Sequence, residues 1–425
     1  MEKFIVEGGK RLTGTVRVSG SKNSALGILV AAALADGECL LHNVPDETDI
    51  RIMIDILIEL GVRVEWLEAN TLRLRTAHLR SYQAPYELVR RMRASFYVAG
   101  LLLARVGKAE VPLPGGCSLG SRPVDFHLKG FQALGADVSI SHGLMKAEAT
   151  RLIGTKIYIN RSSVGTTVNL MLAASLAEGQ TILENAAKEP EVVDLAIFLN
   201  GMGARIKGAG TNVIKIDGVK KLSGTEYTII PDRVEAGTLM IATACTRGDV
   251  VVEEVVPEHL RAVVLTLQEA GVTVEEDLTR FHVVSDRRPK AVDTETAPYP
   301  GFPTDLQQPF VALMSTADGT SIIRETIFDR FRYVDELRRM GADIKVERDT
   351  AIVRGVERLT GAPVEVTDLR AGAALLCAAL GAEGATEMVG VEHIDRGYER
   401  IDQKLRALGA RITRFHAEGE WPSQE

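Results

Sequence analysis

The sequence lacks the features on which several large classes of protein depend. Its four cysteines lie far apart and form no CxxC pair, which argues against a disulfide framework and against a cysteine-ligated zinc site. No apolar run is long enough to cross a bilayer, and the N-terminal segment has no apolar core of the kind that secretion signals contain. No P-loop, dinucleotide-binding fingerprint or HExxH motif occurs. These absences predict a protein of the reducing cytoplasm that uses neither a metal nor a cofactor.

The charge balance narrows the choice of partners. Lys and Arg number 50 and Asp and Glu number 57, so the formal net charge is −7. An acidic chain is a poor candidate for binding nucleic acid or an anionic membrane surface, so we expect neither as a partner. Apolar residues make up 45% of the 425 residues, which is enough to bury large cores. The composition is that of an ordinary globular enzyme.

A short phrase with a central glycine recurs six times along the chain. It consists of a small or apolar residue, Gly, a small residue, any residue, and Val or Ile, as in LGVRV and MGADI. The glycines are Gly61, Gly135, Gly203, Gly271, Gly341 and Gly409. Each follows an amphipathic stretch, so we expect a helix that ends on a left-handed glycine and is followed by a β-hairpin. A helix of small residues precedes the amphipathic one, so each unit is predicted to run strand, helix, strand, helix, strand, strand.

The six units group into two halves of about 210 residues. Two sequence features recur at this longer spacing. They are the related segments RLTG at Arg11 and KLSG at Lys221, each of which begins a unit, and the tripeptide Ala-Pro-Tyr at Ala84 and Ala297. We therefore expect two domains of three units each, with the small-residue helices at the centre, the hairpin strands in outer sheets and a ligand cleft between the domains. A solenoid of stacked units is the alternative, and the distinct segments that begin the two halves disfavour it.

The second unit departs from the others by an insertion rich in proline and glycine, between Val111 and Asp125. This composition excludes regular structure and favours a surface loop that would suit a lid. Cys117 lies at its tip, five residues before Arg122, and a partly exposed thiol near a cation can act as a nucleophile or an acid. The alternative is an accidental surface thiol. Cys245, in an apolar helix, is by contrast expected to be a packing residue.

Charged and hydroxyl residues gather where the small-residue helices are predicted to begin. Lys22 stands in Gly-Ser-Lys-Asn-Ser, and Arg161 precedes a pair of serines. N-capping explains the hydroxyl and carboxylate groups, but cations are unfavourable there, so the basic residues favour a multiply anionic ligand such as a phosphate ester. Asp305, also at a helix start, is either a capping carboxylate or a general base. Arg330 and Arg396 are either solvated charges or members of the same site.

Several motifs together resemble those of one enzyme family. They are GSKNSAL, LPGGCSLGSRPVDFH, ENAAKEPEVVD, PDRVEAGT, FPTDLQ, TDLRAGA and HIDRGYERI. Their combination resembles the UDP-N-acetylglucosamine 1-carboxyvinyltransferases, the enolpyruvyl transferases that open bacterial peptidoglycan synthesis. The resemblance extends over nearly the whole chain, and the cysteine loop distinguishes this family from its sister, the 3-phosphoshikimate 1-carboxyvinyltransferases.

The resemblance implies a fold and a reaction. The fold is a two-domain inside-out α/β barrel of six βαβαββ units, three per domain. The first domain would hold residues 22–230 and the second residues 1–21 and 231–425. The reaction transfers the enolpyruvyl group of phosphoenolpyruvate to the 3-hydroxyl of UDP-N-acetylglucosamine by addition and elimination, and it releases phosphate. These two substrates are the only partners expected for a cytoplasmic monomer without a cofactor.

The resemblance also implies roles for individual residues. Lys22, Arg122 and Arg396 would contact phosphoenolpyruvate. Cys117 would protonate its methylene carbon and could form a covalent adduct with it, and Asp305 would be the general base at the sugar hydroxyl. Further substrate contacts would come from Asn23, Arg93, Pro123, Val124, Asp125, Phe126, Arg161, Ser162, Ser163, Val164, Gly165, Ile327, Arg330, Asp368 and Arg370.

Three other functions fit the residues less well. The 3-phosphoshikimate enzyme shares the fold but lacks the cysteine loop. A catalytically silent regulatory protein that binds a UDP-sugar would have no need of the intact set Lys22, Cys117, Asp305 and Arg396. RNA-end processing, known for a related repeat fold, is disfavoured by the net charge of −7 and by the absence of a basic stripe.

Overall fold

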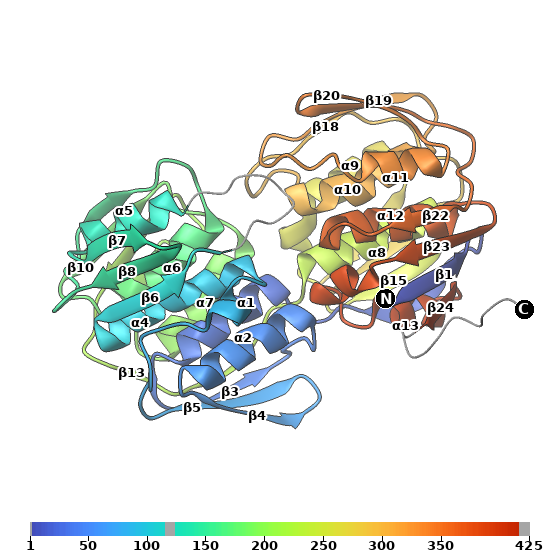
Figure 1. Ribbon diagram of the computed structural model, residues 1–425. Coiled ribbons are helices and arrows are strands. Elements are labelled where there is room, and N and C mark those ends of the chain that lie inside the picture. The colour runs from blue at the N-terminus through green and yellow to red at the C-terminus, as the bar shows by residue number, and fades with distance from the viewer. Residues whose placement is uncertain (1, 115–123, 416–425) are drawn as a thin grey trace, which may run out of the picture. The chain divides into compact units, whose positions relative to one another are not determined.

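The computed structural model describes residues 2–114 and 124–415 of the chain (Figure 1). By its contacts the chain divides into two compact units. Unit 1 comprises Met1–Val18, Arg233–Ala297 and Gly301–Glu425, and unit 2 comprises Ser19–Asp232 and Pro298–Pro300. The chain therefore passes from unit 1 into unit 2 after Val18 and returns after Asp232. The domain boundaries expected near residues 22 and 230 stay a prediction.

Within its described residues, unit 2 contains one sheet for each of its repeats. Its strands are β3 (Ala35–His42), β4 (Arg63–Glu68), β5 (Thr71–Thr76), β6 (Lys108–Pro112), β7 (Asp137–Ser141), β8 (Leu144–Glu148), β9 (Lys156–Tyr158), β10 (Gln180–Glu184), β11 (Arg205–Lys207), β12 (Val213–Asp217), β13 (Leu222–Ser223) and β14 (Glu226–Thr228). The sheets have the orders β13-β3-β5-β4, with β14 also paired to β3, then β6-β8-β7 and β11-β12-β10-β9. Its helices are α1 (Lys22–Ala32), α2 (Thr48–Glu59), α3 (Tyr86–Val89), the 3₁₀ helix η1 (Arg93–Tyr97), α4 (Val98–Val106), α5 (Asp125–Ala133), α6 (Val164–Ala174) and α7 (Pro190–Gly201).

The described part of unit 1 is built in the same way. Its strands are β1 (Lys3–Glu7), β2 (Thr13–Arg17), β15 (Asp249–Glu253), β16 (Thr273–Asp277), β17 (Arg280–Val284), β18 (Thr294–Glu295), β19 (Thr320–Arg324), β20 (Asp343–Glu347), β21 (Thr350–Arg354), β22 (Pro363–Glu365), β23 (Ala385–Val389) and β24 (Arg411–Phe415). The sheets have the orders β16-β17-β15-β2, β18-β19-β21-β20 and β22-β23-β1-β24. Its helices are α8 (Arg233–Cys245), η2 (Pro257–Leu260), α9 (Arg261–Glu269), α10 (Thr304–Met314), α11 (Val334–Arg339), α12 (Leu369–Gly381), η3 (Val391–Arg396) and α13 (Ile401–Ala407).

The two units exchange one strand each. In three repeats a strand, the helix after it and the next strand form a parallel βαβ unit: β9 pairs with β10 across α6, β18 with β19 across α10, and β22 with β23 across α12. Strand β2 precedes α1 in the chain, yet it pairs in parallel with β15 of unit 1. Strand β14 precedes α8, yet it pairs in parallel with β3 of unit 2. This exchange explains why the chain passes from one unit to the other after Val18 and again after Asp232.

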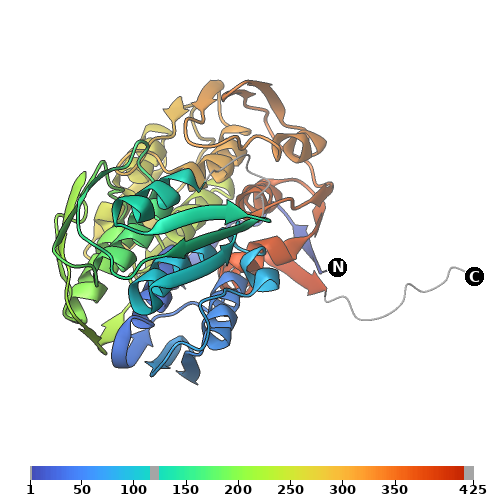
Figure 2. The same cartoon turned by 60° about the vertical axis from the view of Figure 1, so that its left-hand side comes forward.

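The helices rich in small residues form the interior of each unit. In unit 1, α8, α10 and α12 pack against one another, and in unit 2, α4 packs against both α1 and α6. Glycine permits this close approach, because a Cβ on Gly100 of α4 would lie 2.5 Å from the carbonyl oxygen of Asn169 on α6. A Cβ on Gly237 of α8 would likewise collide with Leu306 on α10. With its sheets lying outside these helices, each unit has the inside-out α/β arrangement that the resemblance implies (Figures 1 and 2).

The six repeated glycines confirm the predicted helix ends. Helices α2, α5, α7, α9, α11 and α13 each end shortly before one of these glycines. All six glycines have φ between 86° and 105°, in the left-handed region where a residue with a Cβ is strained. Antiparallel strand pairs follow as predicted, for example β4 with β5, β7 with β8 and β20 with β21.

The insertion in the second repeat begins later than the sequence analysis predicted. Val111 and Pro112 belong to strand β6, in which Val111 is paired with Met145 of β8. Because β6 is an edge strand, a proline at its end removes no hydrogen bond from the interior of the sheet. Cys117, Arg122 and Pro123, which the sequence assigns to the site, lie outside the described residues.

His127 on α5 belongs to a buried polar cluster in unit 2. The side-chain amide nitrogen of Asn169 lies 3.1 Å from His127 Nδ1 and donates to the carbonyl of Phe96 (2.9 Å), while its oxygen accepts from the backbone N–H of Gly100 (2.8 Å). The imidazole packs edge-on against the Phe96 ring, with 5.1 Å between centroids. Burial, helped by the nearby charge of Arg93, lowers the pKa of His127 from 6.5 to about 3. The imidazole is therefore neutral in the folded protein at ordinary pH.

The buried His127 predicts a defined acid sensitivity. Between its unfolded pKa near 6.5 and its folded pKa of about 3, the unfolded chain binds the additional proton, so the free energy of unfolding falls as the pH falls. In His127→Asn, the new side-chain oxygen can still accept from Asn169. Between about pH 7 and pH 5 we expect the free energy of unfolding of this variant to fall by about 1–2 kcal/mol less than that of the wild type. Urea titrations at the two pH values measure the difference.

The matched control is His142→Asn, since His142 is exposed and its left-handed backbone suits asparagine. This variant should show the wild-type dependence on pH. If His127→Asn also loses as much stability as the wild type on acidification, the assignment of this sensitivity to His127 is wrong.

Candidate active site

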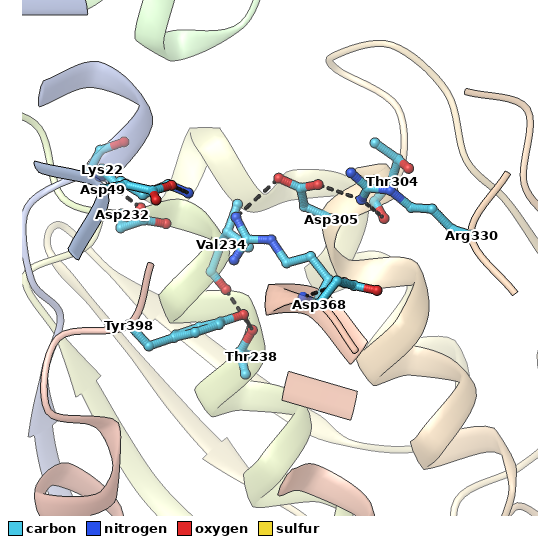
Figure 3. A network of polar contacts seen from close by, with 12 residues as sticks. Lys22, Asp49, Asp232, Val234, Thr238, Thr304, Asp305, Arg330, Asp368 and Tyr398 are labelled. Atoms are coloured by element: carbon cyan, nitrogen blue, oxygen red, sulfur yellow. Dashed lines mark hydrogen bonds and ion pairs between the residues drawn. The ribbon is translucent and has the colours of Figure 1, made fainter. Parts of the chain in front are cut away.

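Lys22 lies at the start of α1, as predicted, and its side chain is buried. Ser21 caps this helix, because its Oγ accepts from the backbone N–H of Ser24 (3.3 Å). The Nζ of Lys22 lies 3.2 Å from Oδ2 of Asp49 in the first turn of α2 (Figure 3). The backbone N–H of Lys22 donates to Oδ2 of Asp232 (3.1 Å). The start of α1 therefore combines the N–H groups of a helix N-terminus with an ammonium group, both of which are groups that bind anions.

A buried carboxylate holds this helix start. Asp194 on α7 is 1% exposed and accepts hydrogen bonds from the hydroxyls of Ser24 and Tyr227, the latter at 2.5 Å. Burial raises the pKa of Asp194, although the hydrogen bonds from these two hydroxyls act in the opposite direction. Tyr227 belongs to β14, the exchanged strand. The surroundings of Lys22 therefore depend on α1, α7 and β14 together.

The other predicted residues of unit 2 lie at the starts of three further helices. Arg93 begins η1, Val124 precedes Asp125 and Phe126 at the start of α5, and Arg161, Ser162 and Ser163 precede Val164 and Gly165 at the start of α6. The three starts meet around His127, since its pKa is influenced by Arg93 and a Cβ on Gly165 would lie 3.6 Å from its Cε1. Asn23, in the first turn of α1, is half-buried.

Asp305 in unit 1 is held between two buried arginines. It lies in the first turn of α10, as predicted. Arg330 donates through Nη1 to Asp305 Oδ1 (2.5 Å) and to the carbonyl of Thr304 (3.0 Å), and Arg370 donates through Nη2 to Asp305 Oδ2 (3.1 Å) (Figure 3). The arginine side chains are 5% and 6% exposed, whereas that of Asp305 is 23% exposed. The carboxylate is thus fixed in orientation and still reachable by a substrate hydroxyl.

Asp368 and Tyr398 position Arg370. Asp368 caps α12, because its Oδ1 accepts from the backbone N–H groups of Arg370 (2.9 Å) and Ala371 (3.0 Å). The guanidinium of Arg370 lies 5.4 Å from the centre of the Tyr398 ring, within the range of a cation–π contact. The Tyr398 hydroxyl is hydrogen-bonded to that of Thr238 on α8 (2.8 Å) (Figure 3). The start of α12 is therefore tied to α8 and, through Asp305, to α10.

The last two predicted residues of unit 1 lie on the segments that follow β23 and β19. Arg396 ends η3, and Arg414 of β24 donates to both carboxylate oxygens of its neighbour Asp395, one of them at 3.0 Å. The hydrogen bond to Asp395 raises the pKa of Arg414, so this guanidinium stays charged. Ile327 follows β19, and its backbone N–H donates to Glu325 (2.8 Å).

Sequence reasoning missed the carboxylates that hold these residues. Asp49 and Asp194 were not singled out, because a single acidic residue in a helix is commonplace. The signal for Asp194 is that it occupies the buried face of an apolar helix, since a buried carboxylate needs partners. The partner of Asp49 is apparent only once α1 and α2 are packed together.

Chemically, each unit offers cations near helix starts, and unit 1 also holds the oriented carboxylate of Asp305. The cations suit phosphate and carboxylate groups, and the carboxylate suits a hydroxyl proton. Across residues 2–114 and 124–415, no group of three or more His, Cys, Asp or Glu side chains could hold a metal ion. No helix in these same ranges has the length and apolar character needed to cross a membrane.

Comparisons with known proteins show the family to which the chain belongs. A family model described as EPSP synthase (3-phosphoshikimate 1-carboxyvinyltransferase) matches residues 6–405. The chain is 59% identical over 416 residues to UDP-N-acetylglucosamine 1-carboxyvinyltransferase 2 of Symbiobacterium thermophilum, covering 97% of this chain and 98% of the relative. It is 55% identical to the enzyme of the same name from Carboxydothermus hydrogenoformans, covering 97% and 99%.

Solved structures agree on the fold. The enolpyruvyl transferase NikO from Streptomyces tendae is similar with a TM-score of 0.87 at 25% identity, covering 98% of this chain and 99% of that one. The EPSP synthase from Acinetobacter baumannii has a TM-score of 0.77 at 20% identity, covering 98% and 100%. The chain therefore belongs to the enolpyruvyl transferase family and, within it, to the UDP-N-acetylglucosamine 1-carboxyvinyltransferases.

Proposed function

We propose that this protein transfers the enolpyruvyl group of phosphoenolpyruvate to the 3-hydroxyl of UDP-N-acetylglucosamine, the first committed step of peptidoglycan synthesis. The observation that carries the proposal is Asp305, an oriented carboxylate held by Arg330 and Arg370 in a chain of this family. Each carboxylate oxygen can accept more than one hydrogen bond, and the side chain is 23% exposed, so a sugar hydroxyl can reach it.

The proposed reaction is an addition followed by an elimination. Asp305 takes the proton of the 3-hydroxyl while the oxygen of that hydroxyl bonds to C2 of phosphoenolpyruvate. A proton is added to C3, so the sugar O–H is added across the double bond. The tetrahedral intermediate then loses a proton from C3 and phosphate from C2, which restores the double bond in the enol ether product. The proton added to C3 would come from Cys117, which lies outside the described residues, and this role rests on the family resemblance.

The remaining residues are proposed to bind the anionic groups. Lys22, oriented by Asp49, and Arg396 would contact phosphoenolpyruvate, together with Arg122 of the undescribed loop. Asn23, Arg93, Pro123 to Phe126, Arg161 to Gly165 and Ile327 would contact the UDP-sugar, where the N-terminus of α6 suits a diphosphate. Arg330, Asp368 and Arg370 would hold Asp305 in place. We also propose that the protein is a cytoplasmic monomer that needs no cofactor.

The first prediction from this proposal concerns the acceptor substrate. The purified protein should release inorganic phosphate from phosphoenolpyruvate when UDP-N-acetylglucosamine is present, because elimination requires the adduct with the sugar hydroxyl. A colorimetric phosphate assay with UDP-N-acetylglucosamine and, in parallel, with shikimate 3-phosphate measures this choice. The proposal would be ruled out if phosphate were released with shikimate 3-phosphate but not with UDP-N-acetylglucosamine. It would also be ruled out if neither acceptor led to phosphate release.

The second prediction concerns the thiols. Burial raises the pKa of Cys39, of Cys377 and of Cys245, the last to about 12, so none of the three supplies an accessible thiolate. We expect the epoxide fosfomycin to alkylate Cys117 alone, as read by peptide mass mapping. Cys117→Ser should take up no label. A label on Cys39, Cys245 or Cys377 would contradict the assignment.

The third prediction concerns the general base. Asp305→Asn should lower kcat by about 10²–10⁴-fold, because an amide cannot accept the hydroxyl proton. Steady-state kinetics with both substrates measure the loss. Asp335→Asn is the matched control, since Asp335 also lies in the first turn of a helix, α11, but its side chain is 77% exposed. A wild-type kcat in Asp305→Asn would show that another group takes the proton.

A further inference from the structure

Glu325, directly after β19, is a buried carboxylate surrounded by hydrogen-bond donors. The residue is 3% exposed. Its Oε1 accepts from the hydroxyl of Thr296 (2.9 Å) and from the backbone N–H groups of Ile327 (2.8 Å) and Phe328 (3.1 Å). Its Oε2 accepts from the hydroxyl of Thr304 (2.9 Å). Four donors from three segments of unit 1 therefore converge on one side chain.

The corresponding position in other repeats serves a different purpose. Asn43, Asn185, Glu254 and Gly390 also directly follow the strand that precedes the amphipathic helix of their repeats, and all four have left-handed φ values between 56° and 78°. The side-chain amides of Asn43 and Asn185 donate to backbone carbonyls, and Glu254 is exposed. Glu325 has no left-handed φ and is buried. The inward carboxylate is thus a departure of this repeat from the common pattern.

The donors of Glu325 lie next to the residues of the candidate site. Thr304 is the first residue of α10 and directly precedes Asp305. Ile327 and Phe328 begin the segment that leads to Arg330, whose guanidinium lies 4.8 Å from the centre of the Phe328 ring. Arg330 in turn donates to Asp305 and to the carbonyl of Thr304. Glu325 therefore contacts both segments whose meeting orients the Asp305 carboxylate.

We propose that Glu325 is a positioning residue for the reaction, an inference that rests on the proposed function. It joins the start of α10 to residues 326–330 and so fixes Asp305 and Arg330 relative to each other. Hydrogen bonds to a carboxylate are stronger than those to a neutral acceptor, and two of the donors are backbone groups that fix the turn itself. Because catalysis is sensitive to displacements of about 1 Å, loosening this junction affects turnover.

The test compares three substitutions at Glu325. Glu325→Ala removes every acceptor, and Glu325→Asp withdraws the carboxylate by one methylene. Glu325→Gln keeps an oxygen for the N–H groups of Ile327 and Phe328, and its amide nitrogen can donate to Thr304. We expect Glu325→Ala and Glu325→Asp to lose about tenfold or more in kcat/KM for UDP-N-acetylglucosamine, and Glu325→Gln to stay within about threefold of the wild type.

The measurements separate positioning from simple stability. Kinetics are recorded at a temperature at which circular dichroism shows each variant folded, and calorimetric titration with UDP-N-acetylglucosamine supplies a second readout that needs no turnover. Glu254→Ala is the matched control, since Glu254 follows the equivalent strand of the same unit but is exposed, and it should behave as the wild type. If Glu325→Ala does not fold, Glu325→Asp decides the question.

Two results would overturn the inference. One is wild-type kcat/KM and affinity in Glu325→Ala, or in Glu325→Asp where the alanine variant does not fold. The other is an equal loss in Glu325→Gln and Glu325→Asp, which would mean that hydrogen-bond geometry is not what matters. A wild type that is inactive with UDP-N-acetylglucosamine would contradict the proposed function, and the calorimetric comparison of the variants would still test the role of Glu325.

Discussion

Close packing between helices of small residues is the constraint on which the rest of each unit depends. Gly100 lies so near the backbone of α6, and Gly237 so near Leu306, that no Cβ fits at either position. This contact brings the helix axes together in the interior and leaves the sheets outside. The helix starts, and with them the charged groups of the candidate site, take their positions from this packing.

Cations lie in the interior of a chain whose net charge is negative. A net charge of −7 describes the whole chain, yet Lys22, Arg330 and Arg370 are each less than 10% exposed. Each has a carboxylate partner, Asp49 for Lys22 and Asp305 for the two arginines. Pairing of this kind makes burial of the cations tolerable, because an unpaired buried charge is very costly. Asp49 also orients Lys22, which is proposed to contact phosphoenolpyruvate.

Departures from the internal repeat point to residues with special tasks. Six repeats share the glycine at the end of the amphipathic helix, and this shared feature serves the fold. The inserted loop after β6, the arginine pair around Asp305 and the inward Glu325 are each found in one repeat only among those compared. The other repeats fold without these side chains. A buried charge that occurs in one repeat only is therefore better explained by function than by stability.

The sequence by itself determined the number of repeats, the ends of the amphipathic helices and the placement of Lys22 and Asp305 at helix starts. These features depend on the glycine φ preference, on apolar periodicity and on capping, all of which act over a few residues. Only the tertiary structure decided that β2 and β14 are exchanged, and that Arg330 and Arg370, 25 and 65 residues from Asp305 in sequence, share its carboxylate. Such pairings depend on how packed helices bring distant segments together, and no local pattern encodes that distance.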